Sequence, residues 1–143
     1  ISISAAKHGA QVTASDISEL VVKTLKQNAL DNNVSIQIIK SDLFNQIPKQ
    51  TFDIIAINPP YYPKQARNDL EMAWYCGVNF EYFQALFSQI KDYMDTSSLV
   101  LMVLSDGCDI PKITSIAKTN GLSFTLFHQQ KIWWEKEFIF RIQ

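Results

Sequence analysis

Residues 52–61 read Phe-Asp-Ile-Ile-Ala-Ile-Asn-Pro-Pro-Tyr, and they decide how the rest of the chain is interpreted. A mostly apolar run, rich in isoleucine, is stopped by two prolines. It predicts a buried strand of the kind found in parallel sheets that are covered on both faces. Each proline fixes its own φ angle, and the first restricts Asn58 to an extended conformation. The stretch therefore predicts a stiff turn at the carboxyl end of a central strand, where ligands bind in open α/β sheets.

This turn offers two hydrogen-bond acceptors at one place. The side-chain carbonyl of Asn58 is one, and the main-chain carbonyl of Pro59 is the other, because a turn residue has no ladder partner. Two converging acceptors can hold both hydrogens of a planar –NH2 group and so direct its nitrogen lone pair toward an electrophile. Tyr61 could stack on the planar group that carries this nitrogen. The alternative is an ordinary turn after a strand, since Asn and Pro are common turn residues.

The composition is that of a soluble globular domain. The chain has 143 residues, which is enough for one domain with a sizeable core. Hydrophobic residues make up 47% and charged residues 19% of the sequence. The formal net charge of -1 does not imply strong non-specific binding to nucleic acid, although it leaves room for a local basic patch.

The cysteines and the lengths of the apolar runs indicate the cellular location of the protein. The two cysteines, Cys76 and Cys108, lack metal-ligand spacing, so we expect a reducing compartment and neither a zinc site nor a disulfide scaffold. We find no signal peptide and no apolar run near the roughly 18 residues that a membrane span needs. The expected location is therefore the cytoplasm, away from membranes.

Apolar strands and amphipathic helices alternate along the chain. We expect strands at residues 11–15, 35–40, 52–57, 98–104, 122–127 and 138–142, with a hairpin tip at 132–137. Helices are expected at residues 1–9, 18–32 and 78–93, and after Asp109 and Pro111, the first of them ending at Gly9. This order predicts an α/β fold with a doubly wound, mostly parallel sheet and a C-terminal antiparallel hairpin.

The segment after the turn, residues 62–77, is expected to form one wall of a substrate site, because long loops in compact domains are usually functional or mobile. Its Trp74 and Tyr75 are interpreted as core residues at the start of the next helix. Lys64 and Arg67 fit a solvated face better than a phosphate site. His8 and His128 lack any catalytic pattern, so both are expected to be structural or exposed.

Residues 52–61 resemble the catalytic motif of class I S-adenosylmethionine-dependent amino-methyltransferases, which include HemK-like release-factor glutamine methyltransferases and adenine-N6 methyltransferases. The resemblance extends over most of the chain. It implies a Rossmann-like catalytic domain over residues 1–143, with S-adenosylmethionine as cofactor and no metal. Asn58 and the Pro59 carbonyl would bind the target amino group and Tyr61 would stack on it. Pro60 and Tyr62 would complete the substrate side.

The resemblance also implies cofactor-binding residues. Asp16, with Ile17 beside it, would accept hydrogen bonds from the ribose hydroxyls, as an acidic residue after the second strand does in dinucleotide-type folds. The alternative for Asp16 is helix capping. Asp42 would accept from the adenine amino group, and Leu43 or Phe44 would pack on the ring; the alternative is an Asx turn with Phe44 in the core. Asn58 would lie beside the cofactor as well.

One part of the family pattern is missing from these residues. The family's first strand and glycine-rich turn, which carries the methionine part of the cofactor, have no counterpart, since the chain has 4 glycines and none are grouped. We therefore expect a domain that is incomplete at its N-terminus.

The resemblance predicts N-methylation of a protein glutamine amide, as in release factors. The first alternative is adenine-N6 methylation of RNA or DNA. An alternative of another class is a non-catalytic binding subunit with this fold. The turn at Asn58 argues against a third possibility, a Rossmann dehydrogenase.

Overall fold

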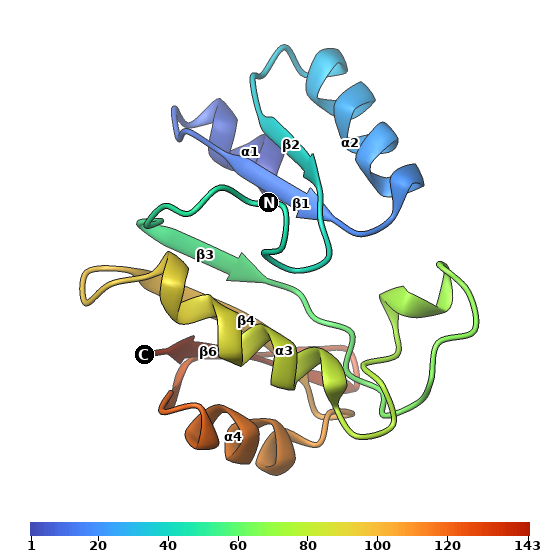
Figure 1. Ribbon diagram of the computed structural model, residues 1–143, viewed down its shortest axis with the longest axis vertical. Helices are drawn as coiled ribbons and strands as arrows, with labels where there is room; N and C mark the ends of the chain where they lie inside the picture. Colours follow the sequence, from blue (N-terminus) through green and yellow to red (C-terminus); the bar gives the residue numbers. More distant parts are fainter. The chain divides into compact units, whose positions relative to one another are not determined.

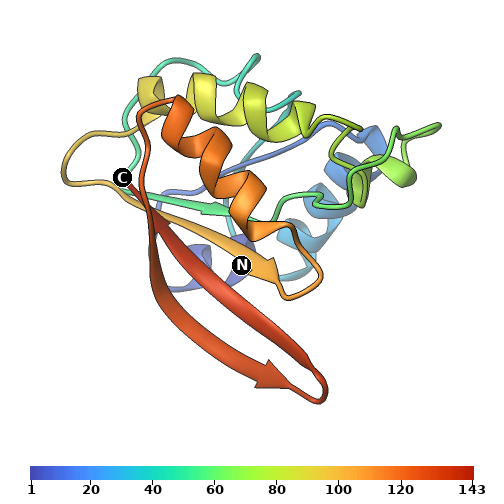
Figure 2. The ribbon, with the colours of Figure 1, turned by 90° about the horizontal axis from the view of Figure 1, so that it is seen from below.

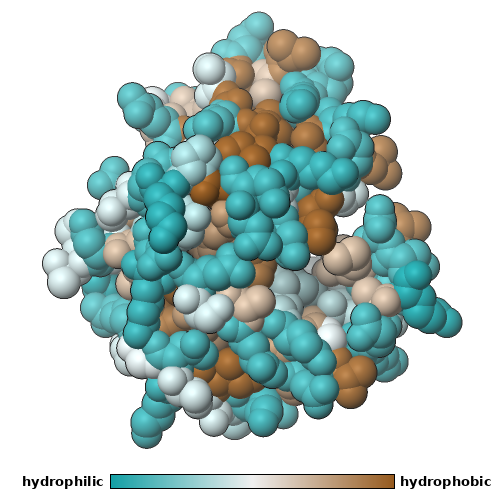
Figure 3. All heavy atoms as spheres, viewed as in Figure 1, coloured by the Kyte–Doolittle hydropathy of each residue, from teal (hydrophilic) through white to brown (hydrophobic). Residues whose placement is uncertain are grey.

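The computed structural model describes the backbone of residues 1–143 and every side chain except that of Ile132 (Figure 1). The chain divides into two compact units, Ile1–Pro48 and Lys49–Gln143. Each unit has its own β-sheet. On the surface seen in Figure 3, hydrophilic residues predominate and apolar residues form scattered patches.

The first unit contains helix α1 (Ser2–Lys7), strand β1 (Thr13–Asp16), helix α2 (Glu19–Asp31) and strand β2 (Gln37–Lys40). Strands β1 and β2 are parallel, with Asp16 opposite Lys40. Helix α2 begins after Ser18, whose hydroxyl accepts a hydrogen bond from the Val21 N–H, and the helix predicted at residues 18–32 is confirmed. Buried Val22 and Ala29 form its inner face.

Helix α1 ends at a glycine in the left-handed conformation. Gly9 has a φ of 88° and lies one residue beyond the C-cap of α1; the Ala10 N–H donates to the Ala5 carbonyl at 3.2 Å and closes the turn. This 6→1 hydrogen bond defines a Schellman motif, in which glycine adopts the left-handed conformation without steric cost. The prediction that Gly9 ends the first helix is confirmed.

The second unit carries a four-stranded mixed sheet in the order β3-β4-β6-β5. Strand β3 pairs in parallel with β4, whereas β6 is antiparallel to both β4 and β5. The strands are β3 (Ile54–Ile57), β4 (Leu99–Ser105), β5 (Phe124–Ile132) and β6 (Glu135–Ile142). The helical segments are η1 (Glu71–Ala73), α3 (Glu81–Gln89), η2 (Ile90–Tyr93) and α4 (Ile110–Thr119). The predicted α/β class, with parallel strands and a C-terminal antiparallel hairpin, is confirmed.

The core of the second unit lies between one face of the sheet and the helices α3 and α4, which pack side by side (Figure 2). Alternate residues of β4 point into this core, as a strand period of two requires. The helices contribute the predicted apolar stripes, and Asp109 caps α4 by accepting from the Lys112 N–H at 3.1 Å. The fully buried core side chains include Phe83, Phe87, Ile90, Val100, Met102, Leu104, Ile113 and Ile142.

Ser98 fixes the start of β3 against the start of β4. Its hydroxyl donates to the Phe52 carbonyl at 2.7 Å and accepts from the Asp95 N–H at 2.9 Å. The Leu99 N–H donates to the Asp53 carbonyl at 2.8 Å and continues the pairing. Because Ser98 is only 2% exposed, these hydrogen bonds are sheltered from water and set the position from which β3 runs toward Asn58.

Several predicted elements differ from those observed. Strand β3 was expected to be central and buried on both faces, but it lies at the edge of its sheet and Ile54 is 63% exposed. The helices of this unit cover only the face that carries Ile55, and β1 and β2 pair with each other instead. Helix α3 begins at Glu81 rather than residue 78, because Gly77 and Phe80 adopt left-handed conformations that a helix cannot contain.

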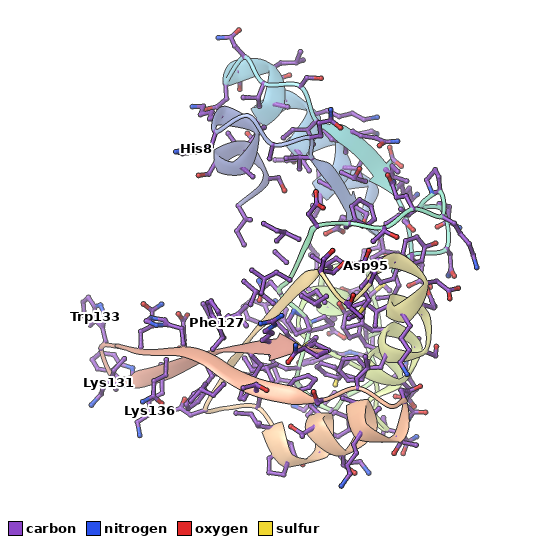
Figure 4. All side chains as sticks on the ribbon, turned by 90° about the vertical axis from the view of Figure 1, so that its left-hand side faces the viewer. His8, Asp95, Phe127, Lys131, Trp133 and Lys136 are labelled. Atoms are coloured by element: carbon purple, nitrogen blue, oxygen red, sulfur yellow. The ribbon has the colours of Figure 1, made fainter. Side chains whose placement is uncertain are left out.

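The C-terminal hairpin is longer than predicted. The ladder continues to Ile132 opposite Glu135, so the tip is Trp133 and Trp134 instead of residues 132–137. The polar residues in this part of the hairpin led to the prediction of a loop. Backbone pairing nevertheless extends both strands into solvent. Figures 2 and 4 show the hairpin projecting beyond the helices, with Trp133 at its end.

Candidate functional site

The turn after β3 carries two hydrogen-bond acceptors, one on an exposed residue and one on a buried residue. Asn58 is exposed, whereas Pro59 is buried and anchors the turn. Among the described residues, no group donates a hydrogen bond to the Asn58 side chain or to the Pro59 carbonyl. A stiff turn with two free acceptors has the hydrogen-bonding capacity to receive two N–H groups, and the role of Asn58 and Pro59 in binding an amino group stays a prediction.

Tyr61 and Tyr62 follow these acceptors and pack on each other. Their ring centroids are 4.7 Å apart, and the ring planes are inclined by 55°. Tyr61 is half-buried, and this burial is the main reason why the pKa of its phenol lies above the ordinary value. Ser105 lies at the carboxyl end of the neighbouring strand β4, and its hydroxyl accepts a hydrogen bond from the Gly107 N–H at 3.3 Å. Ser105 is 7% exposed.

The segment that follows, residues 62–77, is a closed and hydrogen-bonded loop. Its two ends meet in a parallel bridge between Tyr62 and Tyr75. The Tyr62 N–H donates to the Trp74 carbonyl at 3.0 Å, and the Cys76 N–H donates to the Tyr62 carbonyl at 2.9 Å. The loop is therefore attached at both ends to the turn that carries Asn58.

Charged residues stabilise the loop internally. The Arg67 guanidinium pairs with the Glu71 carboxylate through a 2.6 Å contact, and the hydrogen bond from Arg67 lowers the pKa of Glu71. The Lys64 ammonium lies 5.6 Å from the centroid of the Tyr75 ring, within the range of a cation–π contact. The interpretation of Lys64 and Arg67 as a solvated face agrees with their exposure.

Trp74 contradicts the expectation of a core residue. Its side chain is 58% exposed, and nearby Leu70 is 76% exposed. Trp74 follows η1, a short 3-10 turn, and precedes α3 by seven residues, so it lacks a helix that could bury it. Tyr75 is half-buried through its bridge to Tyr62. The loop thus presents large apolar side chains to solvent next to the Asn58 turn.

In the first unit, Asp16 and Asp42 follow adjacent parallel strands at the same edge of the sheet. Asp16 ends β1, and the Ser41 N–H donates to its main-chain carbonyl at 3.0 Å, which places Asp42 one residue further along. Asp16 Oδ1 accepts from the Ser18 N–H at 2.8 Å, but Asp16 is not the helix cap, because that position belongs to Ser18.

The carboxylates at this edge fit a ligand that carries hydroxyl and amino donors. In the described part of the chain, Asp16 Oδ2 and both oxygens of the exposed Asp42 carboxylate accept no hydrogen bond from another residue. Such acceptors suit the ribose and adenine of S-adenosylmethionine. Ile17 is 38% exposed beside Asp16.

Of the two apolar candidates, Leu43 is the more accessible. It is half-buried with a left-handed φ of 49°, whereas Phe44 is buried at 9% exposure, as the alternative of a core phenylalanine required. The assignment of all six cofactor residues, Asn58 included, stays a prediction.

Other features limit the chemistry of the described residues. They contain no group of three or more His, Cys, Asp or Glu side chains that could hold a metal ion. Both cysteines are free thiols, and the two histidines are exposed, which is one of the two environments predicted for them. No helix in this part of the chain is both long and apolar enough to cross a membrane.

Sequence reasoning missed Ser105 and the turn after it. The signal was present, since Ser105 ends a long apolar run and Gly107 follows two residues later. A polar residue at the carboxyl end of a strand parallel to β3 belongs to the edge where ligands bind in α/β sheets. The register of β3 and β4, in which Ile57 lies opposite Met102, places Ser105 at this edge.

The parallel strands and the polar residues at their carboxyl ends define a Rossmann-like α/β protein with a candidate site for a planar amino group. The family model of the methyltransferase small domain matches residues 1–75, which is more than half of the chain. This chain therefore belongs to the methyltransferase small domain family. The predicted family is confirmed, and with it a methyltransferase domain of the S-adenosylmethionine-dependent class.

Relatives and solved structures agree with this placement. A protein N5-glutamine methyltransferase of Methanocaldococcus jannaschii is 47% identical over 64 residues, covering 44% of this chain and 32% of that protein. A release factor glutamine methyltransferase of Leptospira interrogans is 34% identical over 101 residues, covering 67% of this chain and 34% of that protein. The matched region spans only 14% to 34% of such relatives.

The fold is shared with solved methyltransferases. The structure of magnesium protoporphyrin IX methyltransferase from Synechocystis with bound S-adenosylmethionine aligns with a TM-score of 0.64 at 20% identity, over 99% of this chain and 64% of that one. At this identity the match establishes the fold. S-adenosylmethionine is the cofactor of the class, as predicted.

Proposed function

We propose that this protein transfers a methyl group from S-adenosylmethionine to the side-chain amide nitrogen of a protein glutamine. The observation that carries the proposal is the pair of free acceptors, Asn58 Oδ1 and the Pro59 carbonyl, on a turn that two prolines make rigid. The names of the glutamine methyltransferases among the relatives support an amide substrate.

In this proposal, the chain binds and orients the target group. Asn58 and Pro59 each accept one N–H of the planar amide, which fixes the nitrogen and directs its lone pair away from the turn. Tyr61 lies against the amide plane, and Pro60 and Tyr62 limit its movement. Such positioning can supply a large part of a rate enhancement without a strong base.

Asp16, Ile17, Asp42 and Leu43 are proposed to hold the cofactor. Bound S-adenosylmethionine supplies an electrophilic methyl group on a positively charged sulfur. The free oxygen of Asp16 accepts from ribose hydroxyls, and Asp42 accepts from the adenine amino group, as their unused hydrogen-bonding capacity allows. Phe44 supports this segment from the core rather than contacting the ring, in line with its burial.

The test compares two variants of the intact protein with a release factor as the glutamine substrate. Asn58→Ala should lower kcat about a hundredfold or more, because one of two preorganised contacts is lost, and should leave the Kd for S-adenosylmethionine unchanged. Asp16→Ala should raise that Kd by about tenfold, the equivalent of one charge-assisted hydrogen bond. Asn28→Ala, on the exposed side of α2, is the matched control.

Each competing function predicts a different result of this test. Methylation of an adenine-containing oligonucleotide, and not of the release factor, would replace the glutamine proposal with an adenine-N6 activity. Binding of S-adenosylhomocysteine without turnover on either substrate would favour a non-catalytic subunit. Full activity in Asn58→Ala would remove Asn58 from the site.

A further inference from the structure

The hairpin formed by β5 and β6 ends in two exposed tryptophans. Trp133 and Trp134 are 80% and 82% exposed, and their rings meet edge to face with their centroids 5.5 Å apart. An edge-to-face pair leaves flat ring faces open to a further aromatic group. Since neither ring enters the core, the pair gives the fold little hydrophobic stabilisation.

The backbone of the tip does not favour tryptophan either. Trp133 has a φ of 60°, in the left-handed region where a residue with a Cβ atom is strained and glycine is not. Two-residue hairpin turns with a positive φ at their first position usually have glycine, asparagine or aspartate there. A large aromatic residue in a strained and exposed position points to a role other than folding.

Two lysines lie directly opposite each other next to this tip. Lys131 pairs with Lys136 in the ladder, so both side chains are on one face of the hairpin, and Figure 4 shows them on the side away from Phe127. Like charges opposite each other destabilise a sheet. Neither lysine takes part in a salt bridge among the side chains that the structure describes. The two charges therefore suit an anion that comes from outside the chain.

A small hollow lies beside the two lysines. Its volume is about 190 Å³, below the about 300–1,000 Å³ of sites that enclose a whole small molecule. The hollow therefore fits one group of a larger ligand. It is lined by Gln129, Gln130, Lys131, Lys136 and Phe138.

The other face of the hairpin is acidic. Glu135 and Glu137 alternate with Lys136 along β6, so their side chains point the opposite way. The Glu137 carboxylate accepts a hydrogen bond from the Gln130 side chain at 2.8 Å, across the ladder. An anionic ligand is therefore attracted along one face only. This arrangement fits a single strand better than an anionic membrane, which would meet both faces of a projecting tip.

The hairpin presents these groups from a fixed base. Its ladder continues as far as Ile132 opposite Glu135. Asp106, which follows β4, accepts a hydrogen bond from the Lys136 N–H at 3.3 Å, and its own N–H donates to the Lys136 carbonyl at 3.0 Å. Binding would therefore order little backbone, and this part of the entropic cost of association stays small.

We propose that the hairpin tip binds single-stranded RNA. The two indoles stack on unpaired bases, and Lys131 and Lys136 neutralise neighbouring phosphates on the cationic face. Unpaired bases occur in the loops, bulges and ends of RNA, where proteins recognise them by stacking on aromatic side chains. A protein partner fits less well, because lysine is depleted at protein–protein interfaces. The inference does not depend on the proposed function.

The experiment measures the binding of a fluorescein-labelled oligouridylate of about 12 nucleotides to the intact protein by fluorescence anisotropy. Uracil carries no amino group that the Asn58 turn could hold, so the probe separates the hairpin from the proposed methylation site. Wild type should bind the single strand about tenfold or more tightly than a duplex RNA of the same length, because paired bases cannot stack on the indoles.

Two double variants separate stacking from charge. Trp133→Gly with Trp134→Ser keeps a favoured turn sequence, so the hairpin should still form. This variant should weaken binding about tenfold or more and leave its salt dependence unchanged, since no charge is lost. Lys131→Gln with Lys136→Gln should reduce the slope of log K against log salt concentration by about 1.4, the value for two phosphate contacts on a single strand.

The controls remove the same chemical groups elsewhere. Lys23→Gln with Lys26→Gln removes two exposed charges from α2, and Phe127→Ser removes an exposed aromatic ring from the other side of the hairpin. Both should bind oligouridylate as wild type does. As a second readout, oligouridylate should quench the tryptophan fluorescence of wild type but not that of the tip variant, which retains Trp74.

The opposite results would overturn the inference. These are no binding of oligouridylate, equal affinity for the duplex, or wild-type affinity in either hairpin double variant. Binding of polyglutamate, or of vesicles of phosphatidylcholine and phosphatidylserine, in place of the RNA would assign the tip to an acidic protein or to a membrane. Failure to methylate a glutamine contradicts only the proposed function, because the binding assay contains no methyl transfer.

Discussion

Replacing Ser98 by alanine should destabilise the second unit far more than the size of a hydroxyl suggests. The hydroxyl serves two main-chain groups, the Phe52 carbonyl at 2.7 Å and the Asp95 N–H at 2.9 Å. Alanine leaves both without this partner at a position that is 2% exposed. Each partly buried, unsatisfied main-chain group costs about 1–1.5 kcal/mol, so the expected loss is about 2–3 kcal/mol.

Urea denaturation of the intact protein, followed by circular dichroism, measures this loss. With a slope of about 2 kcal/mol per molar urea, the midpoint of unfolding should fall by about 1 M or slightly more. Ser97→Ala is the matched control, because its exposed hydroxyl donates only to Asp95 Oδ1. A loss in Ser98→Ala below about 0.5 kcal/mol, equal to that in Ser97→Ala, would refute the view that Ser98 anchors β3.

Two further predictions concern Cys76 and Asp109 in the second unit. Burial raises the pKa of Cys76 to about 11 from 9.0. At pH 8 the fraction of Cys76 present as thiolate should therefore be about a hundredfold lower than in the urea-unfolded chain, and its rate of reaction with iodoacetamide should fall by the same factor. Equal rates in the folded and unfolded chains would contradict the burial of Cys76. Because the folded protein favours the protonated thiol, this contribution to stability is complete below pH 9 and should be lost as the pH rises toward 11. Asp109→Ala removes the N-cap of α4 and should lower the free energy of unfolding by about 1 kcal/mol in the same urea assay, whereas an unchanged midpoint would show that water replaces the cap.

Local sequence patterns predicted most of the elements, because each pattern had a local physical cause. Asp109 identified a helix start that its side chain caps, and Gly9 identified a helix end through its left-handed conformation. The strand before Asn58 was found from its apolar run and the prolines that stop it.

The features that sequence reasoning missed depend on distant parts of the chain. Strand β3 pairs with β4, which lies more than 40 residues later in the chain. The sequence of a strand does not show on which side the strand will have no neighbour, so its edge position could not be predicted. The exposure of Trp74 could not be read from its hydrophobicity, since the loop is closed by backbone bonds to Tyr62 and needs no core contact from the indole.

Strand β5 is the outer strand of its sheet, and its pairing with β6 slips between Leu126 and His128, where Phe127 is left without a partner in the ladder. An irregularity of this kind bends the strand and increases its local twist. A second, straight strand from another molecule therefore cannot follow the free edge along all nine residues of β5. The extra residue in β5 thus hinders pairing between the free edges of neighbouring copies, which could otherwise join their sheets into a continuous fibre.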